Sequence, residues 1–317
     1  ERVSLETFDS APLGPEDIRL ITRYSLMSTG TENIVFNRLF DQGTHWDNWV
    51  RYPFYPGYAA VGRVAEVGRN APYIVPGTLI AVRGGHASEH VIHHSSAVAV
   101  PEGISEQEAV WFALASIAFS GARASQCQLG DHVLVIGAGP IGQMSVRWAV
   151  ANGAAKVAVV DPVPARLEMA ERGGATAVIS KTVLECKEDV LAAFDGQLPR
   201  IVIDSTGYAD VFSWALELAA KFGRVVVLGD TGRPAGQHLT HDVIMRGLTI
   251  VGAHDSHQNE QWNNVTTARF FFDLVTRGRF DISGLNTHVF KAEDAYEAYS
   301  VANKRRGETM GIVFDWT

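Results

Sequence analysis

Residues Val133 to Gly142 read VLVIGAGPIG, and this stretch decides the fold. Aliphatic residues typical of a buried strand lead directly into the pattern Gly137-x-Gly139-x-x-Gly142, and a helix is predicted at Gln143–Asn152. The first glycine permits a tight turn, the second lets the backbone approach a pyrophosphate, and the third lets the helix pack on the strand. The helix N-terminus adds free N–H groups and the positive end of its dipole. The stretch therefore predicts dinucleotide binding at a strand-to-helix turn.

A second apolar run ends at Asp161, 19 positions after the last glycine of this pattern. A carboxylate at that point accepts hydrogen bonds from the ribose hydroxyls of the cofactor and repels a 2′-phosphate. The sequence therefore predicts NAD rather than NADP. Arg166 is a further cofactor candidate that could stack on the adenine or contact a phosphate; a solvent-facing helix position is the alternative.

The composition is that of an ordinary globular protein. The chain has 317 residues, 46% of them hydrophobic and 20% charged, which is enough for two domains with cores. A net charge of −8 argues against nucleic acid or an anionic membrane as a partner, and no apolar run is long enough to span a bilayer. Two cysteines, Cys127 and Cys186, cannot form a disulfide framework, and no signal peptide is evident, so we expect a cytoplasmic location.

Three segments with different patterns follow one another along the chain. Residues 1–115 carry short strand patterns separated by Gly and Pro, which predicts a β-barrel-like domain. Residues 116–258 alternate six apolar runs with helical stretches, which predicts an α/β fold with a doubly wound parallel sheet. Residues 259–317 hold a predicted helix at 263–276 and a strand-like end at 309–315, and we expect them to return to the first domain. The strands expected in the first segment are residues 18–24, 60–67, 78–82 and 90–92.

Several motifs occur in the order found in one enzyme superfamily. Ser28-Thr29-Gly30-Thr31-Glu32 comes early, Pro56-Gly57-Tyr58 leads to VGRVAEVG at 61–68, and Asp204-Ser205-Thr206-Gly207 ends a later strand. With the glycine loop, they resemble the medium-chain dehydrogenase/reductase superfamily of alcohol-dehydrogenase type over nearly the whole chain. The resemblance implies a GroES-like β-barrel catalytic domain, a Rossmann cofactor domain, and hydride transfer between NAD(P) and an alcohol or carbonyl carbon. It also implies a homodimer or homotetramer joined through the edge strand at 248–253.

The ligands of a catalytic zinc are missing from the matching positions. The zinc-using branch has a cysteine at the position of Thr29, a histidine at that of Tyr58, and a third ligand near Ala115-Ser116. A catalytic zinc needs three N, S or O⁻ ligands, which these residues do not supply. The sequence therefore predicts a zinc-independent member with no metal site.

Without zinc, a hydroxyl or an acid has to handle the proton that accompanies hydride transfer. Thr31 matches the hydroxyl that touches the substrate in this superfamily, and Tyr58 stands where a zinc-binding histidine would be. We predict these two as catalytic residues. The alternatives are a helix-capping hydroxyl for Thr31 and a packing residue in the vacated metal cavity for Tyr58. Glu32 is expected in an internal ion pair.

Residues 41–58 combine aromatic rings with polar groups, and the resemblance places them beside the substrate cleft. Such a surface suits a sugar, a cyclitol or a large flat ring, with a packed loop as the alternative. The candidate substrate-binding residues are His45, Trp46, Trp49, Arg51 and, after the sixth strand, His254. Ligands lie beyond the carboxyl ends of parallel strands. The further cofactor candidates are Pro140, Ile141, Ser205, Thr206, Gly229, Asp230, Thr231 and Ala253.

The histidine-rich stretch HASEHVIHH at 86–94 could suggest a metal site. We expect it to be a strand, with His86 and His90 on one face and His93 on the other, so that its histidines, including His94, are surface or rim residues.

The leading function is therefore a zinc-independent, NAD-dependent oxidoreductase for a secondary alcohol or its ketone. Three alternatives stay open. One is a bacteriochlorophyllide-type hydroxyethyl dehydrogenase, whose motif the segment Ser28–Glu32 resembles. The others are a quinone or enone reductase and a non-catalytic nucleotide-binding protein.

Overall fold

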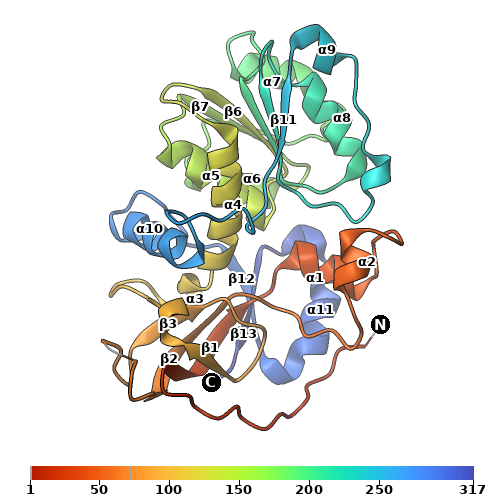
Figure 1. Cartoon of the computed structure of the whole chain (residues 1–317). Coiled ribbons are helices and arrows are strands. Elements are labelled where there is room, and N and C mark those ends of the chain that lie inside the picture. Colours follow the sequence, from red (N-terminus) through yellow and green to blue (C-terminus); the bar gives the residue numbers. More distant parts are fainter. Residues whose placement is uncertain (1, 72) are drawn as a thin grey trace.

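Two β-sheets divide the chain in this computed structural model, which describes residues 2–71 and 73–317 (Figure 1). The first sheet has seven strands in the order β12-β13-β1-β2-β3-β5, with β4 paired to β1. Only β12 and β13 run parallel in it. The strands are β1 (Asp17–Leu26), β2 (Ala60–Val67), β3 (Leu79–Val82), β4 (Glu89–His93), β5 (Val98–Ala99), β12 (Asn286–Lys291) and β13 (Gly311–Asp315). Its short helices are α1 (Thr29–Phe36), α2 (His45–Trp49), α3 (Glu106–Ala109) and α11 (Ala295–Lys304).

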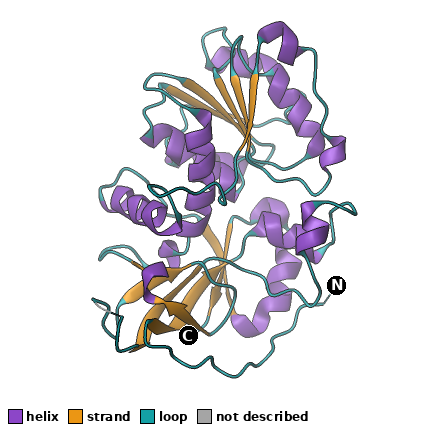
Figure 2. Ribbon diagram, in the orientation of Figure 1, coloured by secondary structure: helices purple, strands orange, loops and turns teal. Residues whose placement is uncertain are grey.

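The second sheet has six parallel strands in the order β11-β10-β9-β6-β7-β8. Its strands are β6 (His132–Ile136), β7 (Lys156–Val160), β8 (Ala177–Ile179), β9 (Ile201–Asp204), β10 (Arg224–Val227) and β11 (Thr249–Gly252). Its helices are α5 (Pro140–Ala151), α6 (Pro164–Arg172), α7 (Lys187–Ala193), α8 (Ala209–Glu217) and α9 (Asp242–Arg246). Figure 2 shows helices on both faces of this sheet.

Strand β6, in the middle of this sheet, is apolar at each position from Val133 to Ile136 because both of its faces are buried. Val133 and Val135 lie in one buried cluster, whereas Leu134 and Ile136 lie in another. Successive side chains of a strand point to opposite faces, so each face needs its own helices and its own core. The predicted doubly wound parallel sheet is therefore confirmed.

Two helices join the sheets. The helix α4 (Phe112–Ser125) runs from the first sheet to the second, and α10 (Asn264–Thr276) packs beside it (Figure 1). One apolar cluster spans the junction, and the Trp148 indole of α5 donates a hydrogen bond to the Ala115 carbonyl at 2.8 Å. The aromatic-rich helix predicted at 263–276 is thus α10, and it stabilises the contact between the two parts.

The strands predicted at 18–24, 60–67, 78–82 and 90–92 correspond to β1, β2, β3 and β4. The strand-like end at 309–315 corresponds to β13, which pairs with β1. The domain boundaries at 115/116 and 258/259 stay predictions. The helix predicted from Gln143 begins earlier, because Pro140 at its first turn needs no N–H partner. Within the described residues, no helix is both long and apolar enough to cross a bilayer.

Candidate active site between the two sheets

The glycine loop has the geometry that a dinucleotide requires. Gly137 has a φ of +89°, and a Cβ there would lie 2.8 Å from the Thr206 methyl group. A Cβ on Gly142 would lie 1.9 Å from the Gly137 carbonyl oxygen, so the turn and the helix packing exclude larger residues. Gly139, by contrast, faces open space. No side chain caps α5, so its first N–H groups and the loop fit a pyrophosphate.

Asp161 is 4% exposed and lies against this loop. Its Oδ2 accepts a hydrogen bond from the Ala138 N–H and its Oδ1 accepts one from the Val163 N–H, both at 2.8 Å. The Arg166 guanidinium lies 3.8 Å from Asp161 Oδ2 and donates to the Arg306 carbonyl at 2.5 Å. Burial lowers the pKa of Arg166, against the effect of Asp161. The solvent-facing alternative for Arg166 is therefore wrong.

The cofactor candidates from the other strands lie at the carboxyl edge of the same sheet. The Ser205 hydroxyl donates to the Ile136 carbonyl at 2.9 Å, and the Thr206 hydroxyl donates to Asp204 Oδ1 at 2.7 Å. Gly229 donates its N–H to the Asp204 carbonyl at 2.8 Å. The Asp204 carboxyl is fully buried, and burial raises its pKa to about 6. The sequence pattern marks Asp204 only as part of the motif that ends this strand, and it does not predict the burial of the carboxyl.

The segment after β10 links this edge to the first sheet. His45 Nε2 lies 2.8 Å from Asp230 Oδ2, and Asp41 donates its N–H to the Gly232 carbonyl at 2.9 Å. Thr231 is buried, and its hydroxyl accepts a hydrogen bond from a main-chain N–H two residues on. A predicted substrate residue and a predicted cofactor residue therefore meet across the junction.

A cluster of hydroxyl groups surrounds the start of α1. The Tyr58 hydroxyl donates to Ser28 Oγ, and the Thr31 hydroxyl lies next to it. The Arg83 guanidinium lies over the Tyr58 ring, 4.9 Å from its centroid. Burial raises the pKa of the Tyr58 phenol, while the two hydroxyls and Arg83 oppose that rise. The phenol is therefore a neutral hydrogen-bond donor at neutral pH.

Arg83 connects this cluster to the second sheet. Its guanidinium donates to the Ala113 carbonyl at 3.2 Å and forms an ion pair with Asp255, just after β11. Asp255 also lies 3.3 Å from the exposed His254 ring. Sequence reasoning missed Arg83; the available signal was a charged residue that directly follows the apolar strand β3.

A second, fully internal network lies behind the cluster. Glu32 is 2% exposed and accepts hydrogen bonds from the Ser28 N–H at 2.7 Å and from the Tyr299 hydroxyl. His86 Nε2 lies 3.2 Å from Glu32, and its Nδ1 lies 2.8 Å from the Ser25 hydroxyl. The internal pairing expected for Glu32 is present.

His86 does not lie on the expected strand, because β4 begins only at Glu89, and it is not a surface residue, because its side chain is 9% exposed. His93 and His94 lie at the end of β4 beside Glu16, and their ligand atoms lie within 4.8 Å of one another. His93 is exposed and the other two are half-buried.

The residues at the positions that the resemblance assigns to zinc ligands make other contacts in the structure. Thr29 is buried as the first residue of α1, and Tyr58 donates to Ser28. The Ser116 hydroxyl donates to the Phe112 carbonyl at 2.8 Å. Ala115 offers no polar side-chain atom. A thiolate, imidazole or carboxylate is lacking at all of these positions, so this donor set does not fit zinc.

The side chains of the aromatic segment at residues 41–58 differ in their exposure to solvent. Trp46 is 3% exposed and packs in a core cluster with Val35, Phe40 and Val50, so its assignment as a substrate-binding residue is wrong. Trp49 and Arg51 are exposed, as is His45. Ala253, a cofactor candidate, is 9% exposed where β11 ends.

Comparison with known proteins places the chain among dehydrogenases. A family model described as zinc-binding dehydrogenase matches residues 140–269. L-threonine 3-dehydrogenase of Bacillus licheniformis is 27% identical over 299 residues, which cover 82% of this chain and 83% of that protein. The alcohol dehydrogenase TADH of Thermus sp. ATN1 has the same fold, with a TM-score of 0.79, 21% identity, and coverage of 99% of this chain and 96% of the other. The chain is thus similar to medium-chain zinc-binding dehydrogenases in part of its sequence and in its fold.

The relatives are named dehydrogenases and reductases, which supports an oxidoreductase. D-xylulose reductase of Scheffersomyces stipitis is a further relative, 29% identical over 221 residues that cover 68% of this chain and 60% of that protein. The glycine loop, Asp161 and the edge of the parallel sheet are the parts of this chain that fit the family's nicotinamide cofactor.

Proposed function

We propose that this chain is a zinc-independent oxidoreductase that transfers a hydride between NAD and a secondary alcohol or its ketone, with a sugar or cyclitol among the candidate substrates. The observation that carries the proposal is the hydroxyl cluster of Tyr58, Ser28 and Thr31 beneath Arg83, at the position of the family's zinc. The names of the relatives support the reaction class, since threonine oxidised at carbon 3 is a secondary alcohol and xylulose is a ketone.

When bound, the nicotinamide supplies the hydride donor or acceptor. The chain must then stabilise the substrate oxygen, whose charge changes during transfer. In the reductive direction, the neutral Tyr58 hydroxyl turns its one proton from Ser28 Oγ to that oxygen, and Thr31 holds a second hydroxyl beside it. In the oxidative direction, the proton of the alcohol passes to Tyr58 as Tyr58 gives its own proton to Ser28, and Ser28 releases its hydroxyl proton to solvent water.

The preference for NAD rests on Asp161. Each of its oxygens already accepts one main-chain hydrogen bond, which fixes the carboxylate in place and leaves further lone pairs for a ribose diol. A 2′-phosphate at that position would meet the same negative charge.

The edge strand β11 supports a further proposal, a homodimer. β11 ends the parallel sheet and has one neighbour, β10. The preceding helix α9 exposes Ile244 and Met245, which are 86% and 72% exposed. An unpaired strand edge beside apolar side chains is a liability unless a second copy covers it.

The test of zinc independence combines turnover with metal analysis. Protein purified without added metal is mixed with NAD and with xylitol, L-threonine or 2,3-butanediol, and reduction is followed at the nicotinamide absorbance. We expect turnover of at least one alcohol at substoichiometric zinc, unchanged by a chelator. One zinc per chain whose removal abolishes turnover would contradict the proposal.

A further inference from the structure

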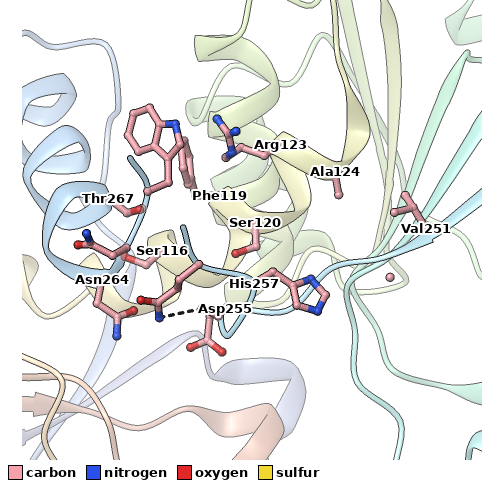
Figure 3. Close-up of a pocket in the computed structure, with 14 residues that line it drawn as sticks. Ser116, Phe119, Ser120, Arg123, Ala124, Val251, Asp255, His257, Asn264 and Thr267 are labelled. Atoms are coloured by element: carbon pink, nitrogen blue, oxygen red, sulfur yellow. Dashed lines mark hydrogen bonds between the residues drawn. The ribbon is translucent and has the colours of Figure 1, made fainter. Parts of the chain in front are cut away.

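A cavity of about 300 Å³ lies between α4, α10 and the segment that follows β11 (Figure 3). One wall is a single face of α4, because Ser116, Ser120 and Arg123 follow one another at helical spacing. The opposite wall includes Asn264 and Trp262. The cavity is therefore a groove that runs along α4.

One end of this groove reaches the hydroxyl cluster. Asp255 lines the cavity and forms the ion pair with Arg83, whose guanidinium lies over the Tyr58 ring. A molecule that fills the groove at the Ser116 end therefore lies next to the groups proposed to carry the proton chemistry.

At the other end of the groove lies Arg123, whose guanidinium has no acidic partner among the described residues. Arg123 follows Ser116 by seven residues, which corresponds to about 10 Å along the helix. Its guanidinium lies 5.5 Å from the Trp262 ring centroid and 5.9 Å from that of Phe119. Within residues 2–71 and 73–317 it makes no ion pair or hydrogen bond.

Other polar groups of the wall are also without partners. The side chains of Ser120, Asn264 and Thr267 make no hydrogen bond with the described part of the chain. The Trp262 indole N–H is buried and likewise has no acceptor among the described residues. Buried polar groups of native proteins are normally hydrogen-bonded, so the indole N–H is an unsatisfied donor within a residue that lines the groove.

We propose that this groove is the distal part of the substrate site and that Arg123 binds a carboxylate of the substrate, about two helical turns from the reacting carbon. The inference rests on the proposed alcohol oxidation and names its substrate class, a hydroxy acid with a distal carboxylate. Arg83 is already neutralised by Asp255, so Arg123 contributes one net positive charge. A planar guanidinium binds a carboxylate through two parallel hydrogen bonds, and its single charge balances that of one carboxylate.

The first measurement is binding, which needs no turnover. Octanoate, a carboxylate on an apolar chain of similar length to the groove, is titrated into the protein by calorimetry, with octyl phosphate and 2-octanol in parallel. We expect Arg123→Gln to weaken octanoate binding about ten- to hundredfold, the equivalent of one charge-assisted hydrogen-bonded contact. The matched control is Arg269→Gln, an exposed arginine of α10 that does not line the cavity.

The second measurement is turnover of 7-hydroxyoctanoate against 2-octanol with NAD. Wild type should favour the hydroxy acid in kcat/KM, Arg123→Gln should remove that preference, and the control Arg269→Gln should keep it. Failure of both alcohols to react would overturn the proposed function alone. Octanoate that binds wild type and Arg123→Gln equally, does not bind, or binds more weakly than octyl phosphate would overturn the carboxylate site.

Discussion

Replacing Tyr58 with Phe tests the assignment of the proton chemistry to this hydroxyl. The ring, its packing and the Arg83 guanidinium above it are retained, and one donor to Ser28 Oγ is lost. Losing a preorganised donor to a developing oxyanion typically lowers the rate about 10²–10³-fold. If Tyr58 only fills the cavity, the lost hydrogen bond costs roughly 0.5–1.5 kcal/mol of unfolding free energy and kcat is unchanged.

The assay is single-turnover hydride transfer at saturating NAD, with urea unfolding measured alongside. The matched control is Tyr299→Phe, which removes another hydroxyl with a buried acceptor, Glu32, away from the cluster of Tyr58 and Thr31. We expect Tyr299→Phe to lose stability but keep its rate within a few-fold, and Thr31→Val to slow transfer as Tyr58→Phe does. Equal, small rate effects of Tyr58→Phe and Tyr299→Phe would refute the reasoning.

The pH profile gives an independent readout of the same hydroxyl. Because burial raises the pKa of Tyr58, the reductive rate of the wild type should persist above the ordinary tyrosine value of about 10. A fall of that rate near neutral pH would assign the proton to another group.

Three further predictions concern the cofactor, the pH dependence of stability and the assembly. Asp161→Ser should weaken NAD binding and narrow its advantage over NADP in fluorescence titrations; unchanged discrimination would contradict the role of the carboxylate. The pKa of buried Asp204 is raised to about 6, so the folded state holds that proton more tightly and stability is lost as pH rises from about 4 to about 6, by roughly 3 kcal/mol. Asp204→Asn should remove this loss in urea titrations, and an identical slope in both proteins would disprove it. Light scattering should give a dimer mass that Ile244→Glu lowers toward the monomer, and a wild-type monomer at micromolar concentration would exclude the interface.

The fold could be predicted because its signals are local. The glycine loop, the β-branched runs and the spacing to Asp161 all lie within about thirty residues, and each constrains the backbone directly. Trp46 was misassigned because an aromatic residue in a polar loop reads the same whether its ring faces a ligand or a core. His86 was misassigned for a related reason, since alternation along a stretch says nothing of where the strand begins.

The contacts that give the site its chemistry are distant in sequence. Arg83 and Asp255 are 172 positions apart, and Tyr58 and Ser28 are 30 apart. Neither pair follows a spacing rule, because packing of the two sheets brings Arg83 to Asp255, and pairing of β1 with β2 in the first sheet brings Ser28 to Tyr58. The sequence predicts that Thr29, Tyr58 and Ser116 stand where the resemblance puts zinc ligands, but the contacts among Tyr58, Ser28 and Arg83 appear only in the three-dimensional arrangement.

The arrangement also constrains how the substrate oxygen is stabilised. A zinc ion carries two positive charges, whereas Arg83 is paired with Asp255 and adds almost no net charge at the cluster. In the proposed mechanism, the positive electrostatic potential at the substrate oxygen is therefore weaker than it would be beside a zinc ion. Hydrogen bonds to that oxygen have to supply the stabilisation instead. Directed bonds stabilise an oxyanion only where donors are fixed, and here the Tyr58 hydroxyl is held by Ser28 Oγ while its ring is covered by the Arg83 guanidinium. The zinc-independent mechanism that we propose therefore depends on the fixed positions of these hydroxyl groups rather than on a net positive charge.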